Sequence, residues 1–343
     1  MGAHIFQVKL PLSVLDLSPV SSGSSAAQAL ADTLELARLA DRLGYRRYWM
    51  AEHHNIPSIA SSSPEIMIGQ VGRVTRQIRV GSGGIMLPNH APLRVAEAFR
   101  TLEALFPGRV DLGIGRAPGT DPMTALALRR DPDSLTADDF PDRLAELMAF
   151  GDGGFPEGHP FQRVRALPDD VPLPPIWLLG SSDFSGRLAA RLGLGFAFAN
   201  HFSPEPTVPV MREYAATFRP SARLGAPASI LTVAAICADT QAEADRLATT
   251  LELSWVRLRT GRAAPLASPE EALAYPYSAV EREIADFARR LAFVGTAAAV
   301  RERIEALAAE TRATEVMVTT MTHDPRARRH SYVLLAKAFE LGS

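Results

Sequence analysis

The sequence predicts an α/β protein built as a (β/α)8 barrel, also called a TIM barrel. Eight short apolar runs are spaced along the 343 residues and are typical of strands. Most of these runs are continuous rather than alternating, as expected for parallel strands covered on both faces. Helical patterns lie between the runs, and repeated strand–helix alternation of this kind indicates a closed parallel barrel.

The predicted strands, in chain order, span residues 10–16, 47–51, 78–87, 110–115, 176–180, 196–199, 230–238 and 315–320. The first predicted helix, 26–43, carries its apolar residues on one face; Ser25 can cap its start and Gly44 can end it. Two later helices begin with a proline in the first turn, at Ser63-Pro64 and at Asp324-Pro325.

Two segments are longer than a minimal strand–helix unit requires. Residues 118–175, after the fourth strand, are rich in Pro, Gly and Asp, and one helix is expected there at 138–150. Residues 240–292, after the seventh strand, hold more helix than one crossover needs. Within them, 260–277 is either a mobile lid or a disordered surface loop. We expect the whole chain, 1–343, to be one domain carrying these two insertions.

Composition excludes several classes of function. The formal net charge of -2 and the pI of about 6.5 provide no basic field for nucleic acid or for an anionic membrane. No segment approaches the ~20 apolar residues of a membrane span, and the N-terminus is interpreted as a first strand rather than a signal peptide. The one cysteine, Cys237, lies in an apolar run, which favours a buried inert thiol over a nucleophile. We therefore expect a cytoplasmic protein.

Small residues end the third and fourth predicted strands. Gly83-Gly84 lies in the third, and Gly113 and Gly115 close the fourth, immediately before Arg116. Small residues at strand ends let a flat ligand approach the backbone, and an arginine offers a planar set of donors to an anion. The alternatives are a bulge at Gly83-Gly84 and simple close packing at the other two glycines beside a surface arginine.

A serine-rich loop follows the fifth strand and begins a helix. It contains Gly180, Ser181, Ser182 and Ser185. Free backbone N–H groups at a helix start, together with hydroxyl groups, can bind a phosphate. The alternative is an ordinary helix cap at Ser182.

Two adjacent histidines, His53 and His54, follow the second strand. Residues just past a barrel strand face the active site, where a histidine can exchange a proton or donate to a developing anion. The alternative is a structural histidine bonded to a nearby loop. Further potential metal ligands near strand ends are Glu52, His90, His201 and His323. No metal site is predicted, because adjacent histidines leave opposite sides of an extended chain and no H-x-H or H-x-x-x-H spacing occurs.

These groups gather at one face of the predicted barrel and describe a site for a flat, phosphorylated cofactor. Across nearly its whole length the chain resembles the bacterial luciferase-like flavin monooxygenases, in their stand-alone, non-luminescent subgroup. The motifs that carry the resemblance are LSVLDLSPV (12–20), RLGYRRYWMAEHHN (42–55), RVGSGGIMLPNHAPLRVAE (79–97), PGRVDLGIGRAPGTD (107–121), PIWLLGSS (175–182) and VMVTTMTHD (316–324).

The resemblance implies an enzyme that oxygenates a small organic substrate with O₂ and reduced FMN supplied by a separate reductase, for example in a tailoring step of secondary metabolism. It implies that His53 acts as an acid or base and that Gly83-Gly84 forms a cis peptide beside the flavin ring. It also implies cofactor binding by a set of phosphate-contacting residues, namely Arg116, Ser181, Ser182 and Ser185. Ser181 replaces a glutamate of luciferase and Gly115 a cysteine, which argues against light emission.

The resemblance further implies a homodimer formed through residues 63–76 and 91–106. Three other interpretations remain open. They are an oxidoreductase of the same superfamily that uses the deazaflavin F420, a flavin-binding protein without turnover, and a metal-dependent barrel hydrolase.

Overall fold

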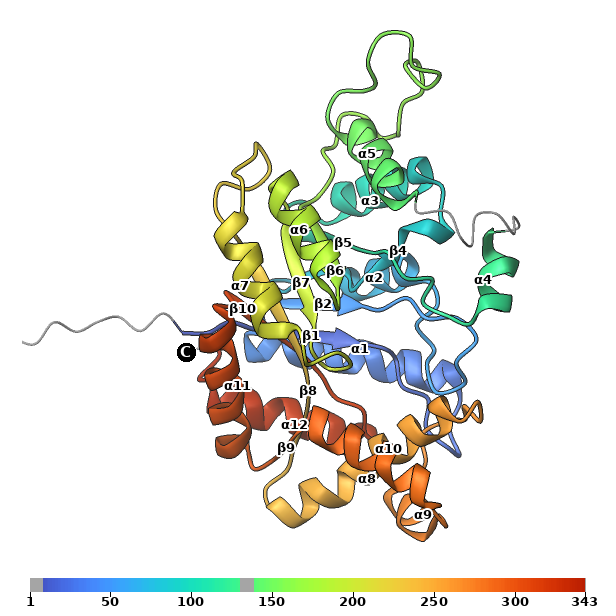
Figure 1. The fold of residues 1–343 in the computed structure, drawn as a ribbon, viewed down its shortest axis with the longest axis vertical. Coiled ribbons are helices and arrows are strands. Elements are labelled where there is room, and N and C mark those ends of the chain that lie inside the picture. The colour runs from blue at the N-terminus through green and yellow to red at the C-terminus, as the bar shows by residue number, and fades with distance from the viewer. Residues whose placement is uncertain (1–8, 130–138, 343) are drawn as a thin grey trace, which may run out of the picture.

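The computed structural model describes residues 9–129 and 139–342 and confirms the predicted barrel (Figure 1). Its eight strands are β1 (Leu12–Asp16), β2 (Arg47–Met50), β3 (Arg79–Ser82), β5 (Val110–Gly115), β6 (Ile176–Gly180), β7 (Gly195–Ala199), β8 (Ser229–Cys237) and β10 (Glu315–Thr319). All neighbouring strands are parallel, and β10 pairs with both β1 and β8, which closes the ring. Their carboxyl ends therefore share one face of the barrel.

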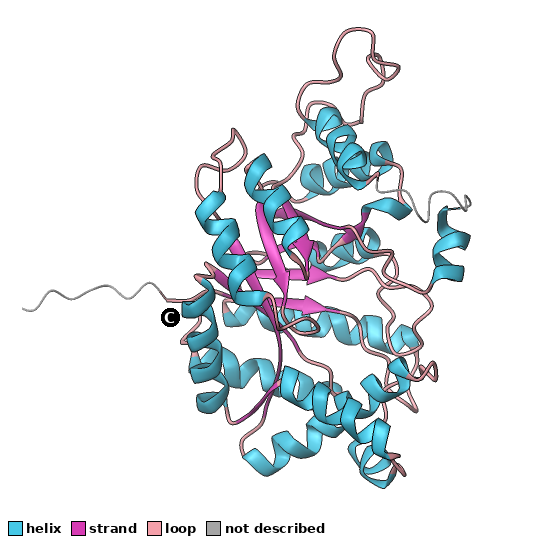
Figure 2. Ribbon diagram, in the orientation of Figure 1, coloured by secondary structure: helices cyan, strands magenta, loops and turns pink. Residues whose placement is uncertain are grey.

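Helices cover the outside of the strands (Figure 2). They are α1 (Ala26–Leu43), α2 (Pro64–Val74), α3 (Pro92–Leu105), α4 (Pro122–Arg129), α5 (Phe140–Gly151), α6 (Asp183–Leu192), α7 (Thr207–Thr217), α8 (Gln241–Arg259), α9 (Pro269–Ala274), α10 (Ala279–Leu291), α11 (Ala297–Thr311) and α12 (Pro325–Ala338), with a short 3₁₀ turn at Leu87–Asn89. The predicted limits of α1 hold: Ser25 accepts from the Gln28 N–H, and Gly44 adopts φ 84°. None of the described helices has the length and apolar character needed to cross a bilayer.

The predicted strand at 78–87 is two strands rather than one. β3 ends at Ser82, the Gly83-Gly84 peptide is cis as the resemblance implied, and β4 (Ile85–Met86) then pairs with β5. The Ser82 Oγ donates to the Gly113 carbonyl (2.8 Å) and accepts from the Gly113 N–H (3.0 Å). A side chain thus replaces the ladder bonds lost where the strand breaks, so the chain can bend there without leaving polar groups unpaired. A further short strand, β9 (Phe293–Gly295), pairs in parallel with the last residues of β8 and was not predicted.

The two insertions lie at opposite ends of the molecule in the view of Figure 1, with α5 at the top and α8, α9 and α10 at the bottom. The helix expected at 138–150 is α5, and residue 138 lies outside the described residues. The expectation of a single helix in 118–175 is wrong. The short α4 forms in a Pro- and Gly-rich stretch because Asp121 accepts from the N–H groups of Met123 and Thr124 at its start.

A charged network fills the end of the barrel interior where the strands begin. Arg47 on β2 donates to Asp111 on β5 (2.7 Å) and to Glu315 on β10 (2.9 Å), and all three side chains are at most 6% exposed. Arg79 on β3 also donates to Asp111 (2.7 Å), and Ser13 on β1 donates to Glu315 (2.5 Å). The network therefore joins five strands.

Cys237 lies at the end of β8 and is buried. Burial raises the pKa of its thiol to about 12, so the thiol stays protonated at neutral pH. This agrees with the inert role predicted from the sequence.

Candidate functional site

A cavity of about 230 Å³ opens at the carboxyl ends of the barrel strands. Of the residues predicted to form the site, His53, Gly83, Arg116, Ser181, Ser182 and Ser185 line this cavity. Gly84 is not among the lining residues. A Cβ atom there would lie 2.8 Å from the Gly113 carbonyl oxygen, so Gly84 serves the close contact of β4 with β5.

The glycines of β5 differ in their surroundings. A Cβ on Gly113 would lie 2.0 Å from the Ser82 carbonyl oxygen, so the close-packing interpretation fits this residue. Gly115 lines the cavity, and a Cβ there would lie 2.7 Å from the Met86 sulfur. Gly83 also lines the cavity, and a Cβ there would lie 2.6 Å from the Leu15 Cδ1. Glycine at both positions therefore makes room for neighbouring side chains of the cavity wall.

One end of the cavity is rich in hydrogen-bond donors. Ser182 precedes α6 in extended conformation, and its side chain makes no cap hydrogen bond, contrary to the ordinary-cap alternative. The first N–H groups of α6 thus keep their partial positive charge directed at the cavity end. The Arg116 guanidinium lies 4.3 Å from the ring centre of Phe184, in the first turn of the same helix. Among the described residues, Arg116 has no carboxylate partner.

His53 faces the cavity, whereas His54 does not line it. The His53 N–H donates to the Ser61 carbonyl (2.9 Å), and its Nδ1 lies 3.4 Å from the Gly119 carbonyl oxygen. Burial lowers the pKa of His53 below its usual 6.5. The ring is therefore neutral at pH 7 and can either donate or accept a hydrogen bond.

His54 belongs to a separate group behind the cavity wall. Its Nε2 and the Nε2 of His90 each lie 2.9 Å from one oxygen of Glu52, whose other oxygen accepts from the Met86 N–H (2.8 Å). Burial alone would raise the pKa of Glu52, but the hydrogen bonds from His54 and His90 lower it to about 2. Within 9–129 and 139–342, no set of three or more His, Cys, Asp or Glu side chains is placed to hold a metal ion.

Sequence reasoning treated His201 only as a weak metal ligand, but it lines the cavity just beyond the end of β7. Its Nδ1 is buried and has no hydrogen-bond partner among the described residues. Burial and the neighbouring His53 lower the pKa of His201 to about 4. The signal available in the sequence was its position after a strand, the same signal that identified His53.

This depressed pKa predicts a pH-dependent stability. The unfolded chain binds a proton on His201 near pH 6.5, whereas the folded protein resists it down to about pH 4. Between these values the unfolded state binds more protons, so the free energy of unfolding falls as the pH falls. From pH 7 to pH 5 the wild type should lose about 2 kcal/mol more than His201→Asn. Urea denaturation at both pH values measures this; equal losses would contradict it.

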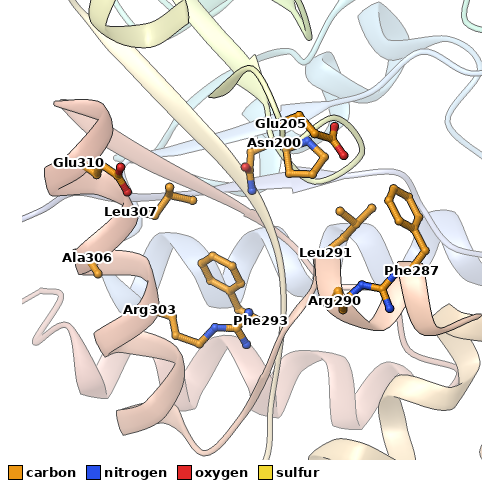
Figure 3. A pocket seen from close by; sticks show the side chains of 11 residues that line it. Asn200, Glu205, Phe287, Arg290, Leu291, Phe293, Arg303, Ala306, Leu307 and Glu310 are labelled. Atoms are coloured by element: carbon orange, nitrogen blue, oxygen red, sulfur yellow. The ribbon is translucent and has the colours of Figure 1, made fainter. Parts of the chain in front are cut away.

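A second hollow lies outside the barrel mouth, between α10 and α11 (Figure 3). Its volume is about 530 Å³, and Arg303 packs over the Phe293 ring at 4.3 Å on its wall. It contains Asn200 and Glu205 from the β7–α7 connection but none of the predicted site residues. Its charged donors come from other elements, Arg290 on α10 and Arg303 on α11.

Comparison with known proteins identifies the family. A model of the luciferase-like monooxygenases matches residues 10–315. Over 325 residues the chain is 43% identical to a luciferase-like monooxygenase of Escherichia coli strain K12, covering 95% of this chain and 96% of that protein. Over 328 residues it is 35% identical to N-acetyl-S-alkylcysteine monooxygenase of Bacillus subtilis strain 168, covering 95% and 97%.

A solved structure agrees with this assignment. The fold matches the crystal structure of apo-MsnO8 with a TM-score of 0.87 at 40% identity, covering 97% of this chain and 98% of that chain. The resemblance carried by the motifs is thus confirmed, and the chain belongs to the luciferase-like monooxygenase family.

Proposed function

We propose that this monooxygenase takes reduced FMN from a separate flavin reductase and uses O₂ to oxygenate a small organic substrate. Bound reduced FMN supplies two electrons, so that one oxygen atom of O₂ enters the substrate and the other leaves as water. One observation carries the proposal. Arg116, the start of α6 without a side-chain cap and three serine side chains meet at one end of a cavity that Gly83 and Gly115 also line.

The donor set fits the phosphate of FMN. The Arg116 guanidinium is exposed and has no carboxylate partner among the described residues, and the start of α6 has no side-chain cap. The first turn of α6 carries one carboxylate, that of Asp183, which is paired with Arg187. Phosphate satisfies the guanidinium and the helix start at once, because its oxygens accept from guanidinium, hydroxyl and backbone N–H groups. We assign this role to Arg116, Ser181, Ser182 and Ser185, and expect the flavin ring to lie against Gly83.

His53 and the apolar wall would serve the reaction itself. The neutral His53 ring can hold or transfer a proton at the reacting oxygen. The cavity wall also includes Leu15, Leu17, Trp49 and Met317, whose side chains exclude water from the site.

Binding of flavin tests the assignment. We expect Arg116→Ala and Ser182→Ala each to weaken binding of reduced FMN by about tenfold or more, because each removes a hydrogen bond to a charged group. Calorimetry under anaerobic conditions measures the affinity. Arg187→Ala is the matched control, since Arg187 lies on α6 but is already paired with Asp183 and Glu213. It should change the affinity less than about threefold.

Riboflavin, which lacks the phosphate, separates a phosphate role from a general effect. Its affinity should not respond to the Arg116 or Ser182 substitution. Unchanged FMN affinity in both variants would place the phosphate elsewhere. Preferential binding of F420 would instead support deazaflavin chemistry. Flavin binding without product, in the presence of a reductase, NADH and O₂, would support a binding protein without turnover.

The homodimer stays a prediction. The segments that the resemblance implicates correspond to α2 and α3, which expose Ile66 and Leu105, each 63% accessible. Exposed apolar side chains of this size are compatible with a contact surface.

A further inference from the structure

We call the cavity at the carboxyl ends of the strands, which is proposed to bind FMN, the flavin cavity. Another cavity, of about 260 Å³, adjoins it. The two share Leu17, His53, His201 and Phe202, so these side chains form the boundary between them. We call this adjoining cavity the apolar chamber. Its principal walls are apolar side chains after β2, on β8 and on α8, namely Ile56, Ile59, Ile236, Leu251, Trp255 and Leu258.

Packed chain encloses the chamber on the side away from the barrel. Ala263 and Ala264, in the segment after α8, line it. The Leu266 N–H donates to the Val20 carbonyl (2.8 Å), and the Leu266 carbonyl accepts from the Ser22 N–H (2.8 Å). The first part of 260–277 is thus fixed to the loop after β1 and forms a chamber wall, unlike the disordered loop considered from the sequence.

The chamber offers nothing to a charged ligand. No Asp, Glu, Lys or Arg of the described residues lines it. Its two titratable groups are His53 and His201, and burial lowers the pKa of both. At neutral pH the wall is therefore uncharged, and a carboxylate or sulfonate placed inside would lose its hydration without gaining a partner.

Two residues that line the chamber each carry a polar atom without a partner. The Nδ1 of His201 and the Oγ1 of Thr319 are both buried without a hydrogen bond among the described residues. Buried polar groups are normally paired, because an unpaired one costs free energy. A ligand that carries one hydrogen-bonding group on an apolar body removes this cost.

We infer that the apolar chamber holds the substrate and that this substrate is an uncharged, mostly apolar molecule whose one polar group is hydrogen-bonded by His201. This inference rests on the proposed function, which places the flavin in the adjoining cavity. The chamber volume lies just below the ~300–1,000 Å³ typical of pockets for drug-sized ligands, so a molecule of one or two rings is the expected size. His201 would hold it beside His53.

Three probes that differ in a single group test the inference on flavin-free protein. Calorimetric titration should give the tightest binding for 2-naphthol. Naphthalene should bind about fivefold more weakly, since it lacks the hydrogen bond. Binding of 2-naphthoate should be at least about tenfold weaker than that of 2-naphthol, since a carboxylate finds no partner. His201→Phe should abolish the preference for naphthol over naphthalene, and His201→Asn should retain part of it.

A chamber-filling variant locates the probe. Ala264→Phe should weaken naphthol binding at least about tenfold while leaving FMN affinity unchanged, because Ala264 lines only the chamber. Ala298→Phe, at an exposed position of α11, is the matched control and should bind naphthol like the wild type.

The outcomes separate this inference from the proposed function. If 2-naphthoate binds as tightly as 2-naphthol, or if Ala264→Phe binds naphthol normally, the substrate inference is wrong even where FMN binds as proposed. A different result is that the wild type prefers naphthol over naphthalene and His201→Phe loses that preference, while Arg116→Ala binds FMN with wild-type affinity. In that case the chamber assignment is supported and the flavin assignment is wrong.

Discussion

Replacing Arg47 by methionine is expected to lower the free energy of unfolding by about 3–5 kcal/mol. The Arg47 side chain is 6% exposed and is bonded to two carboxylates, Asp111 and Glu315, that are 0% and 2% exposed. Methionine keeps much of the apolar stem but leaves both buried charges short of a partner. Denaturation in urea at pH 7 measures the loss.

The neighbouring Arg46 provides a matched control, because it contacts the same Glu315. Its Nε lies 3.4 Å from the Glu315 carboxylate, and its side chain is 51% exposed. Solvent screens such a pair, so Arg46→Met should cost less than about 1 kcal/mol. If both variants lost the same free energy of unfolding, burial would not be what decides how much these ion pairs stabilise the protein.

Replacing His53 by asparagine is expected to reduce oxygenation at least about 100-fold, the lower end of what a positioned acid or base contributes. His53 lines both the flavin cavity and the apolar chamber, so it lies where the substrate and the cofactor would meet. The measurement is incorporation of ¹⁸O from ¹⁸O₂ into a neutral probe that the wild type oxygenates, with a reductase, NADH and FMN. Affinity for FMN should change little, which separates chemistry from binding.

His54→Asn is the control for this experiment. His54 is adjacent in sequence, but its ring is bonded to Glu52 and does not line the cavity. We expect oxygenation within about fivefold of the wild type. If His53→Asn retained the wild-type rate, or if both variants lost activity equally, the assignment of His53 would be wrong.

The pattern of apolar runs, together with residues typical of helix ends, was sufficient to predict the barrel. Continuous apolar runs marked the eight strands, and Ser25 and Gly44 marked both ends of α1. These signals are local: a strand buried on both faces must be apolar throughout, and a helix end needs a cap. The division of 78–87 into β3 and β4 was not predicted from the apolar pattern, although the resemblance implied the cis peptide at Gly83-Gly84. The Ser82 hydroxyl that bonds Gly113 at this point spans 31 residues of sequence, so no local pattern indicates it.

The candidate site divides in the same way. The positions of His53, Arg116 and the serine loop after strands could be predicted, since parallel strands of a barrel bring their carboxyl ends to one face. The diverging directions of His53 and His54 also follow from the alternation of an extended chain. His201 also follows a strand, but the role proposed for it rests on its burial beside His53 and on its unpaired Nδ1, which only the structure shows.

The sequence by itself determined the fold, the family and the face of the barrel that carries the site, because these depend on local pattern and on motifs. Only the tertiary structure decided which charges are buried together and which cavities adjoin. Arg47 meets Asp111 across 64 residues and Glu315 across 268, and the apolar chamber joins residues after β2 to residues of α8. Such contacts form because the closed barrel brings distant side chains together, and no local sequence pattern predicts which side chains will meet.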